Sequence, residues 1–344
     1  MTLPIPLDYA PMEAKPIASL PEGDAWQYEP KWDGFRCLAF KDAADVHLRS
    51  KSGQPFERYF PEIVAAVAEV PATRFVLDGE LVIPEGDALS FDQLLMRIHP
   101  AESRVRKLAR EHPARFVAFD LLVGANGRSL TDLPLAQRRE ALERFAERAF
   151  VKAPAFRLSP ATRSRADVER WLATSGDDID GIVAKRLDAA YCSGDRTGMQ
   201  KYKRVRTADC VVGGFRYGSK TRVVGSLLLG LYDDEGLLHH VGFTSNIPRE
   251  QREALTAKLE KLVLPPGFTG RAPGGPSRWS TERSGEWEPL RPSLVVEVRY
   301  DHVSGGRFRH GTAFVRWRPD KAPRQCTFEQ IRTPPARLPE GTAS

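Results

Sequence analysis

The chain has 344 residues, of which 41% are hydrophobic and 28% are charged, and its formal net charge is +6. This composition is typical of a globular protein with enough apolar material for two domains, and the mild basic excess permits a polyanionic partner without requiring one. The four cysteines are far apart and form no CxxC pair, which argues against a zinc site and a disulfide framework. No apolar run reaches the roughly 18 residues of a membrane span, and the N-terminus has no signal-peptide pattern. We therefore expect a cytoplasmic protein without a membrane partner.

The first part of the chain predicts a mixed α and β domain. Residues 1–25 are rich in proline and indicate an extended arm. Beyond them, short apolar runs bounded by turn residues predict strands, and apolar residues spaced on one helical face predict helices. Pro134 and Gly176 suit a helix start and a helix end respectively. The strands are expected at 35–40, 46–50, 75–83, 115–123 and 180–185, and the helices at 136–150 and 166–175.

The pattern changes after about residue 206, within the segment KRVRTAD, where we place a domain boundary. The remaining chain is dense in short strands, with one amphipathic helix at 249–262 and a good hairpin loop at Asp233–Gly236. Such a set suits a small barrel such as an OB-fold. Its strands are expected at 210–215, 226–232, 238–243, 294–300 and 312–318.

Several charged residues interrupt apolar strands. A carboxylate removed from water must be paired, hydrogen-bonded or bound to a metal. For each residue alone, a salt bridge at a strand end is the simpler explanation. Together, carboxylates and lysines in one cleft provide what phosphate transfer with a divalent metal requires. The carboxylates are Asp78, Glu80, Asp120 and Asp180, and the lysines are Lys185, Lys201 and Lys203, the last two on one strand face.

The stretch EPKWDGFR at 29–36 has two interpretations. Alone, it is most simply a charged surface turn, because K-x-D-G matches are common by chance. Beside a cationic cleft, Lys31 becomes a candidate nucleophile, since neighbouring cations favour the neutral amine. Asp33 could orient that amine, hold a metal or fix the turn, and Gly34 would let the backbone pass close to a ligand. Arg36 could reach a phosphate or a ribose hydroxyl.

An ordered set of motifs resembles the covalent nucleotidyltransferase superfamily, and in particular ATP-dependent DNA ligases of the compact bacterial LigC type. The segments MRIHPAESRV at 96–105 and AKRLDAAYCSGDRTG at 184–198 are similar to that type as well. Six motifs in order are much more specific than any one of them. They are Lys31-Trp-Asp33-Gly34-Phe-Arg36, Leu77-Asp-Gly-Glu80-Leu, Phe119-Asp120, Asp180-Gly181-Ile-Val-Ala-Lys185, Lys201-Tyr-Lys203 and Arg316-Trp-Arg318-Pro-Asp320-Lys321.

The resemblance implies an α+β architecture. A nucleotidyltransferase (ATP-grasp-like adenylation) domain of antiparallel sheets and helices would span residues 1–206, and an OB-fold β-barrel would span 207–344. The implied activity is ATP-dependent sealing of 5′-phosphate/3′-hydroxyl nicks, through a lysyl-AMP and a DNA-adenylate, in DNA repair. The implied cofactors are ATP and Mg²⁺ or Mn²⁺, the partner is nicked duplex DNA, and the protein would act as a monomer.

The resemblance also assigns roles around the nucleotide. Lys31 would carry AMP covalently. Glu29, with its neighbouring backbone, would meet the adenine edge, and Phe119 would stack on the adenine face. Arg36 and Glu80 would hold the ribose hydroxyls.

Further roles concern the phosphates and the metal. Lys201 and Lys203 would contact the AMP phosphate as catalytic groups, together with Lys31 and Asp33, and Lys185 would line the same nucleotide site. Asp180 and Glu80 would help to bind the metal. On the second domain, the motif residues that would close over the pyrophosphate are Arg318 and Lys321.

Two positions depart from the family pattern. The usual Ser-Arg after the nucleophile is Ser50-Lys51 here, so the forked grip of arginine on a phosphate is lost. Either Lys51 suffices as a point charge or Arg49 takes over, and recognition of the 5′-phosphate depends on which. The usual glutamate of the EGxVxK motif is Asp180, one methylene shorter, so that the metal would be held through water.

Contacts to DNA are expected to be made mainly to phosphates. The basic segments with interleaved aromatic residues are KRVR at 203–206, FRYGSKTR at 215–222 and RFRH at 307–310. The alternative for each segment is a solvated surface of a basic protein. For the whole chain, the alternatives are an RNA ligase, a guanylyl-transferring capping enzyme, or a non-catalytic nucleic-acid-binding protein with a relict nucleotide site.

Overall fold

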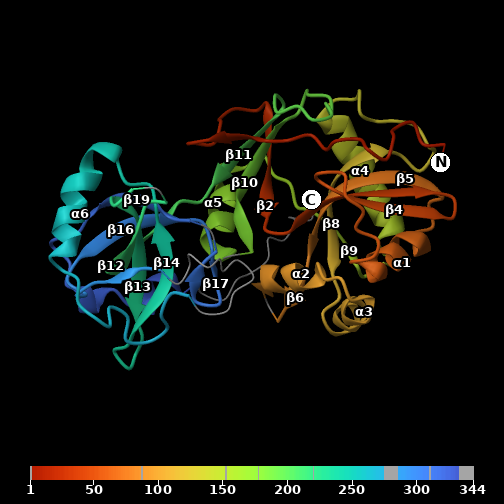
Figure 1. Ribbon diagram of the computed structural model, residues 1–344. Coiled ribbons are helices and arrows are strands. Elements are labelled where there is room, and N and C mark those ends of the chain that lie inside the picture. The colour runs from red at the N-terminus through yellow and green to blue at the C-terminus, as the bar shows by residue number, and fades with distance from the viewer. Residues whose placement is uncertain are drawn as a thin grey trace. The chain divides into compact units, whose positions relative to one another are not determined.

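Figure 1 shows the protein as a computed structural model. It describes residues 2–86, 88–151, 153–176, 178–219, 221–274, 286–309 and 311–332. The chain divides into two compact units between Arg204 and Val205, a point that lies within the KRVRTAD segment. The first unit contains residues up to Arg204, and the second contains Val205–Arg332.

The described part of the first unit contains two large sheets whose strands are mostly antiparallel (Figure 1). One sheet has the strand order β1-β11-β10-β2, and only β1 runs parallel to its neighbour among these pairs. Its strands are β1 (Lys15–Ile17), β11 (Met199–Lys203), β10 (Ile179–Arg186) and β2 (Trp26–Trp32). The other sheet has the order β4-β3-β5-β8-β9, in which β9 runs parallel to β8. Its strands are β4 (Asp45–Ser50), β3 (Phe35–Asp42), β5 (Arg74–Val82), β8 (Arg115–Val123) and β9 (Phe156–Leu158).

Helices and the N-terminal arm cover these sheets. The apolar side chains of α1 and α4 pack with those of the β4-β3-β5-β8-β9 sheet in one large core. The arm covers another part of that sheet, because Ile5 and Met12 are buried beside Leu38 and Leu122. The helices are α1 (Pro61–Glu69), α2 (Phe91–Arg97), α3 (Glu102–Glu111), α4 (Leu135–Ala149) and α5 (Arg165–Thr174), and β6 (Pro84–Glu85) pairs with β7 (Ala88–Leu89).

The second unit is built on one antiparallel sheet with the order β14-β13-β12-β16-β19, and β15 pairs beside it with β12. Thr244 at the end of β14 and Thr312 before β19 form a single bridge, so the described ladders leave the sheet partly open. An OB-fold is also a partly open five-stranded barrel. The elements are β12 (Arg206–Tyr217), β13 (Val224–Tyr232), β14 (Leu238–Thr244), η1 (Arg249–Gln251), α6 (Arg252–Glu260), β15 (Glu288–Pro289), β16 (Val295–Tyr300), β17 (Val303–Ser304), β18 (Arg307–Phe308), β19 (Ala313–Trp317), η3 (Pro323–Gln325) and η4 (Phe328–Ile331).

The predicted α+β class is confirmed, and most predicted elements appear within a few residues of their expected bounds. The strand expected at 115–123 is β8, and the helix expected at 136–150 is α4. Gly176 follows α5 with a positive φ of 52°, as its expected place at a helix end requires. The helices α1, α2 and α3 were not predicted from the sequence pattern. Among the described residues, no helix has the length and apolar character needed to cross a membrane.

Candidate nucleotide-binding site

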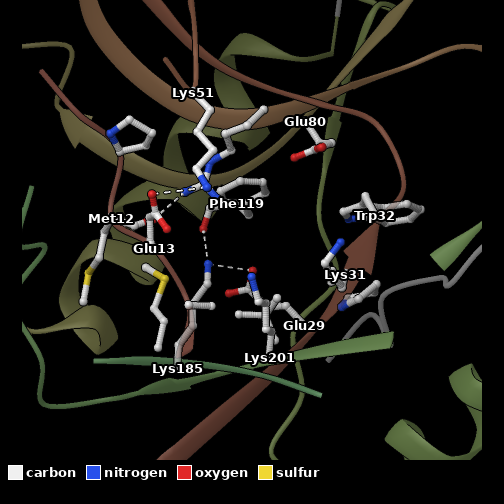
Figure 2. Close-up of a pocket in the computed structure, with 16 residues that line it drawn as sticks. Met12, Glu13, Glu29, Lys31, Trp32, Lys51, Glu80, Phe119, Lys185 and Lys201 are labelled. Atoms are coloured by element: carbon white, nitrogen blue, oxygen red, sulfur yellow. Dashed lines mark hydrogen bonds and ion pairs between the residues drawn. The ribbon is translucent and has the colours of Figure 1, made fainter. Parts of the chain in front are cut away.

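A cavity of about 230 Å³ lies in the first unit and is lined by both of its large sheets (Figure 2). The first sheet contributes side chains from β2, β10 and β11, and the second contributes side chains from β3, β5 and β8. The N-terminal arm completes the lining, which the sequence did not suggest. The lining residues are Pro11, Met12, Glu13, Ala14, Glu29, Pro30, Lys31, Trp32, Arg36, Lys51, Glu80, Phe119, Val183, Lys185, Met199 and Lys201.

Strand register explains why so many charged residues meet here. In the β2-β10-β11 part of the first sheet, Glu29 lies opposite Val183, which lies opposite Lys201. In the next row that points to the same face, Lys31 lies opposite Gly181, which lies opposite Lys203. The predicted common face of the two β11 lysines is therefore present, but Lys203 is exposed and does not line the cavity.

Lys31 is held by a carboxylate from the neighbouring strand. Its Nζ forms an ion pair with Oδ2 of Asp180, whose side chain is 8% exposed. Carboxylate oxygens of Asp33 and Asp180 also lie within 4.8 Å of each other. Asp180 was predicted as a metal ligand. In this structure it also fixes the position of the candidate nucleophile.

Two motif glycines are required by close approach of the backbone. A Cβ at Gly34 would lie 2.3 Å from the carbonyl oxygen of Leu81, so this glycine lets the backbone pack closely against β5. Gly181 has a φ of 150°, and a Cβ there would lie 2.0 Å from the carbonyl oxygen of Tyr202. Both glycines therefore allow the strands that carry the site to pack closely.

Glu29 is engaged in a buried ion pair. Its Oε2 lies 2.8 Å from Nζ of Lys185, and its Oε1 accepts a hydrogen bond from Nε2 of Gln27 at 2.8 Å. The side chains of Glu29 and Lys185 are 2% and 4% exposed. These two partners hold the Glu29 carboxylate in one orientation at the cavity wall, and each of its oxygens can accept a further hydrogen bond.

Phe119 has cations against its ring. Nζ of Lys185 lies 4.7 Å from the ring centroid, and Cζ of Arg36 lies 4.5 Å from it. Lys185 also donates a hydrogen bond to the Phe119 carbonyl oxygen at 3.3 Å, as Figure 2 shows. Such cation–π contacts hold the aromatic side chain in one orientation at the cavity wall.

Arg36 is fixed by Asp78, one of the carboxylates that interrupt apolar strands. Its Nε and Nη2 donate to the two oxygens of Asp78, each at 2.5 Å. The Tyr191 hydroxyl donates to Asp78 as well, at 2.6 Å, and Asp78 is fully buried. Burial opposes the charged form of Arg36, but the attraction of Asp78 outweighs it and raises the pKa of the guanidinium. The only trace of this role in the sequence is a charged residue in an apolar strand.

Glu80 lines the cavity opposite Arg36 in the β3–β5 register. Burial raises the pKa of its carboxyl to about 8, although the charges of Arg36 and Lys31 act in the other direction. Within the described part of the chain, the structure gives its carboxyl no hydrogen bond or ion pair. The carboxyl of Glu80 could therefore bind a metal ion through an oxygen or hydrogen-bond to a sugar hydroxyl.

Two further cations line the cavity. Burial lowers the pKa of Lys201, and the neighbouring charges of Lys31, Lys51 and Lys203 lower it further. The other cation is Lys51, whose Nζ lies 3.2 Å from Oε1 of Glu13. An anionic ligand would reduce the mutual repulsion of these lysines.

At the Ser50-Lys51 departure from the family pattern, Lys51 reaches the cavity and Arg49 does not. Arg49 is the alternative phosphate ligand. Its Nη1 lies 2.5 Å from Oε1 of Glu57, and its side chain is 16% exposed. Lys51 lines the cavity, and its side chain is 58% exposed. The structure therefore brings Lys51 to the site and engages Arg49 elsewhere.

The predicted cations of the C-terminal motif lie in the second unit. Arg318 donates to both oxygens of Asp209 at 2.8 and 3.0 Å, and Nζ of Lys321 lies 3.6 Å from the same carboxylate. Arg318 also bonds to Asp320. Asp209 was not anticipated, because it lies in an apolar strand more than 100 residues earlier in the chain.

Asp120 has a structural explanation. Its two oxygens accept from Nε and Nη2 of Arg138 on α4 at 2.9 and 3.0 Å, and both side chains are 1% exposed. This ion pair joins β8 to the helix that covers it. The simpler explanation, a paired carboxylate, therefore holds for Asp120 and Asp78.

Comparison with known proteins agrees with this arrangement. A family model described as "ATP dependent DNA ligase domain" matches residues 11–203, and another described as "ATP dependent DNA ligase C terminal region" matches residues 220–321. The chain belongs to the ATP-dependent DNA ligases. The two matched regions of this ligase fall one in each of its two units.

Similar proteins support the same family. The ligase is 44% identical to the DNA ligase C2 of Mycolicibacterium smegmatis, over 97% of each chain. It is 42% identical to the DNA ligase C of Mycobacterium tuberculosis, over 97% of this chain and 96% of that one. A solved structure of a Lig E DNA ligase, 17% identical, covers 90% of this chain and 99% of that chain with a TM-score of 0.54, which shows a shared fold. The predicted resemblance to the bacterial LigC type is confirmed.

Proposed function

We propose that this ATP-dependent DNA ligase seals 5′-phosphate/3′-hydroxyl nicks in duplex DNA and that Lys31 carries the AMP. The adenylation domain would be residues 1–206, the OB-type domain 207–344, and the ligase would act as a monomer. The observation that carries the proposal is the position of Lys31 at the wall of a cavity that also contains Lys201, Lys185, Glu29 and Phe119.

In the first step, the Lys31 amine would attack the α-phosphorus of ATP. A P–N bond forms and the bond to pyrophosphate breaks, so pyrophosphate leaves with the electron pair. Asp180 keeps Nζ beside its own carboxylate, which orients the amine and offers a nearby acceptor for the proton. Lys201 lies across the same sheet face and would neutralise charge on the phosphate oxygens.

The nucleoside would be held by the surrounding residues. Phe119 offers its ring for stacking, and Glu80 offers a carboxyl that can hydrogen-bond to a ribose hydroxyl. Arg36, in the orientation set by Asp78, would bind the other ribose hydroxyl. Lys203 would meet the phosphate from the next row of the sheet. In the second unit, Arg318 and Lys321 would approach the pyrophosphate from the C-terminal motif.

The residues present fit a divalent cation. Asp33 and Asp180 bring carboxylate oxygens within 4.8 Å of each other, and such hard oxygen donors suit Mg²⁺ or Mn²⁺. Asp180 and Glu80 were the predicted ligands, and metal binding was one of the predicted roles of Asp33, which would join Asp180 in holding the ion. When bound, the ion would neutralise charge on the phosphate oxygens.

The later steps reuse the same residues. An oxygen of the nick 5′-phosphate would attack the phosphorus of lysyl-AMP, the P–N bond would break, and Lys31 would regain its proton. The 3′-hydroxyl would then attack the 5′-phosphate and release AMP. Lys51, at the cavity rim, would meet the 5′-phosphate as a point charge.

Labelling with α-labelled ATP and Mg²⁺, followed by a denaturing gel, tests this proposal. Protein freed of bound AMP beforehand should take up label, and Lys31→Ala should abolish it. Lys15→Ala, an exposed lysine on β1 of the same sheet, serves as the matched control and should label normally. Labelling from GTP alone would indicate a capping enzyme. Absence of labelling in AMP-free wild-type protein would indicate a relict site, and nicked substrates with DNA or RNA strands separate a DNA ligase from an RNA ligase.

A further inference from the structure

A third row of side chains continues the face of the sheet that carries Lys31 and Glu29. It contains Gln27 on β2, Lys185 on β10 and Met199 on β11. Each residue advances a strand by about 3.3 Å, so this row lies roughly 13 Å along β2 from the row of Lys31. The base of a nucleotide whose α-phosphorus is at Lys31 would therefore lie toward this end of the face.

Glu29, at this end of the cavity, presents acceptors and no donor. Its carboxylate has a hydrogen-bond donor on each side, because Nε2 of Gln27 donates to Oε1 and Nζ of Lys185 donates to Oε2, each at 2.8 Å. Gln27, Glu29 and Lys185 are 6%, 2% and 3% exposed, so little water competes for these bonds. What the carboxylate offers to a ligand in the cavity is its remaining lone pairs.

Lys185 joins this carboxylate to the aromatic wall of the cavity. Its Nζ also donates to the Phe119 carbonyl oxygen at 3.3 Å and lies 4.7 Å from the centroid of the Phe119 ring (Figure 2). One ammonium group thus sets the position of the acceptor relative to the ring on which a base would stack. Gln27 holds the other side of the carboxylate and is not among the residues that line the cavity. It can therefore act on a base only through Glu29.

An acceptor in a fixed position distinguishes purines at their 6-position. Adenine has an amino donor there, whereas guanine and hypoxanthine have an oxygen acceptor. A 6-oxo base also has a proton on N1, so a mobile carboxylate could turn to that neighbouring donor and bind it. A carboxylate that is held on both sides cannot follow, and the 6-oxygen is left facing an acceptor.

We infer that Gln27 is a positioning residue that gives the site its preference for a 6-amino purine nucleotide, because it holds Glu29 as a fixed acceptor. Glu29 was expected at the adenine edge from the sequence, whereas Gln27 was not among the predicted site residues. The inference rests on the proposed AMP transfer to Lys31.

AMP transfer from ATP is compared with nucleotide transfer from inosine triphosphate (ITP), which has a 6-oxygen and a proton on N1. With AMP-free full-length ligase, the ratio of kcat/KM for ATP to that for ITP should fall about tenfold in Gln27→Leu, the effect of one buried hydrogen bond, mainly through a higher KM for ATP. Gln27→Glu keeps the shape and replaces the donor with a carboxyl that repels Glu29, so the ratio should fall at least as far. Gln200→Leu and Gln200→Glu are the matched controls and should keep the wild-type ratio, because Gln200 lies on β11 of the same sheet with its side chain on the other face.

Purine riboside triphosphate, which has no 6-substituent, separates positioning from a merely structural role. Its transfer rate should be the same in Gln27→Leu and in the wild type, because this base lacks the amino group that Glu29 would bind. An unchanged ATP-to-ITP ratio in both Gln27 variants, or an equal loss of rate with all three nucleotides, would overturn the inference. Equilibrium binding of the same nucleotides in the Lys31→Ala background gives the ratios without AMP transfer. Absence of label in the wild type would refute the proposed function, and the binding ratios would still decide the role of Gln27.

Discussion

The hydrogen bonds of Asp78 lead to a prediction about a residue outside the cavity lining. Asp78 is fully buried and accepts from Nε and Nη2 of Arg36 at 2.5 Å and from the Tyr191 hydroxyl at 2.6 Å. Substitution of Asp78 by Asn keeps the size of the side chain and removes its charge. The new amide group presents donors where an acceptor is needed, so the guanidinium of Arg36 loses at least one of its two bonds. Asp78 is therefore a positioning residue for Arg36.

The magnitude follows from the burial of this cluster. Removal of one partner from a buried ion pair costs about 3–5 kcal/mol. The Arg36 side chain is 24% exposed, so part of its charge can be rehydrated, and we expect a loss of about 2–4 kcal/mol in stability. Tyr191→Phe removes one hydrogen bond from the same carboxylate and should cost about 1 kcal/mol.

Single-turnover AMP transfer at varied ATP concentration measures the functional part. Asp78→Asn should raise the ATP concentration needed for the half-maximal rate by about 10- to 100-fold, the equivalent of one charged hydrogen bond. If Asp78 acts only through Arg36, the double variant Asp78→Asn/Arg36→Ala should be no worse than Arg36→Ala alone. A folded Asp78→Asn protein with the ATP dependence of the wild type would refute this reasoning.

Three further predictions concern other parts of the fold. Gly181→Ala places a Cβ 2.0 Å from the Tyr202 carbonyl oxygen, so thermal denaturation should show a lowered midpoint and the label from ATP should be lost; a fully active variant would contradict the close approach. Arg138→Met leaves Asp120 unpaired in the core and should cost about 3–5 kcal/mol in urea denaturation, with unchanged ATP dependence in the folded protein; an unchanged urea midpoint would argue against a structural role. Burial on folding lowers the pKa of His240 from 6.5 to about 3, so the unfolded chain binds a proton before the folded protein does as pH decreases. The folded state therefore loses stability as pH falls from 6.5 to about 3. At pH 4.5 this loss in the free energy of unfolding is about 2–3 kcal/mol. The His240→Phe variant should therefore lose less unfolding free energy than the wild type between pH 7 and pH 4.5. Parallel plots of unfolding free energy against pH for the two proteins would contradict this prediction.

The meeting of charged residues in the candidate site could largely be predicted because these residues alternate along strands. Period-two spacing places Glu29 and Lys31 on one face of β2, and it places Lys201 and Lys203 on one face of β11. What spacing could not give is how far each side chain reaches into the cavity. Lys203 shares the face and yet lies exposed beyond the lining, although Lys31 in the same row lines the cavity.

Partners that are distant in sequence were not predictable. The pattern marked Asp78 and Asp120 as charges needing a partner, but Arg36 and Arg138 become their partners only through strand register and helix packing. The contribution of the N-terminal arm at 11–14 was missed for a similar reason. A proline-rich extended segment has no periodicity from which its buried side could be read.

Peptide mapping by mass spectrometry tests the central claim most directly. AMP-free ligase is incubated with ATP and Mg²⁺, digested, and searched for peptides that carry AMP. We predict a single adduct on Lys31, bonded through the acid-labile P–N link and lost when pyrophosphate is added back. An AMP adduct on Lys185 or Lys201 with Lys31 unmodified would contradict the account.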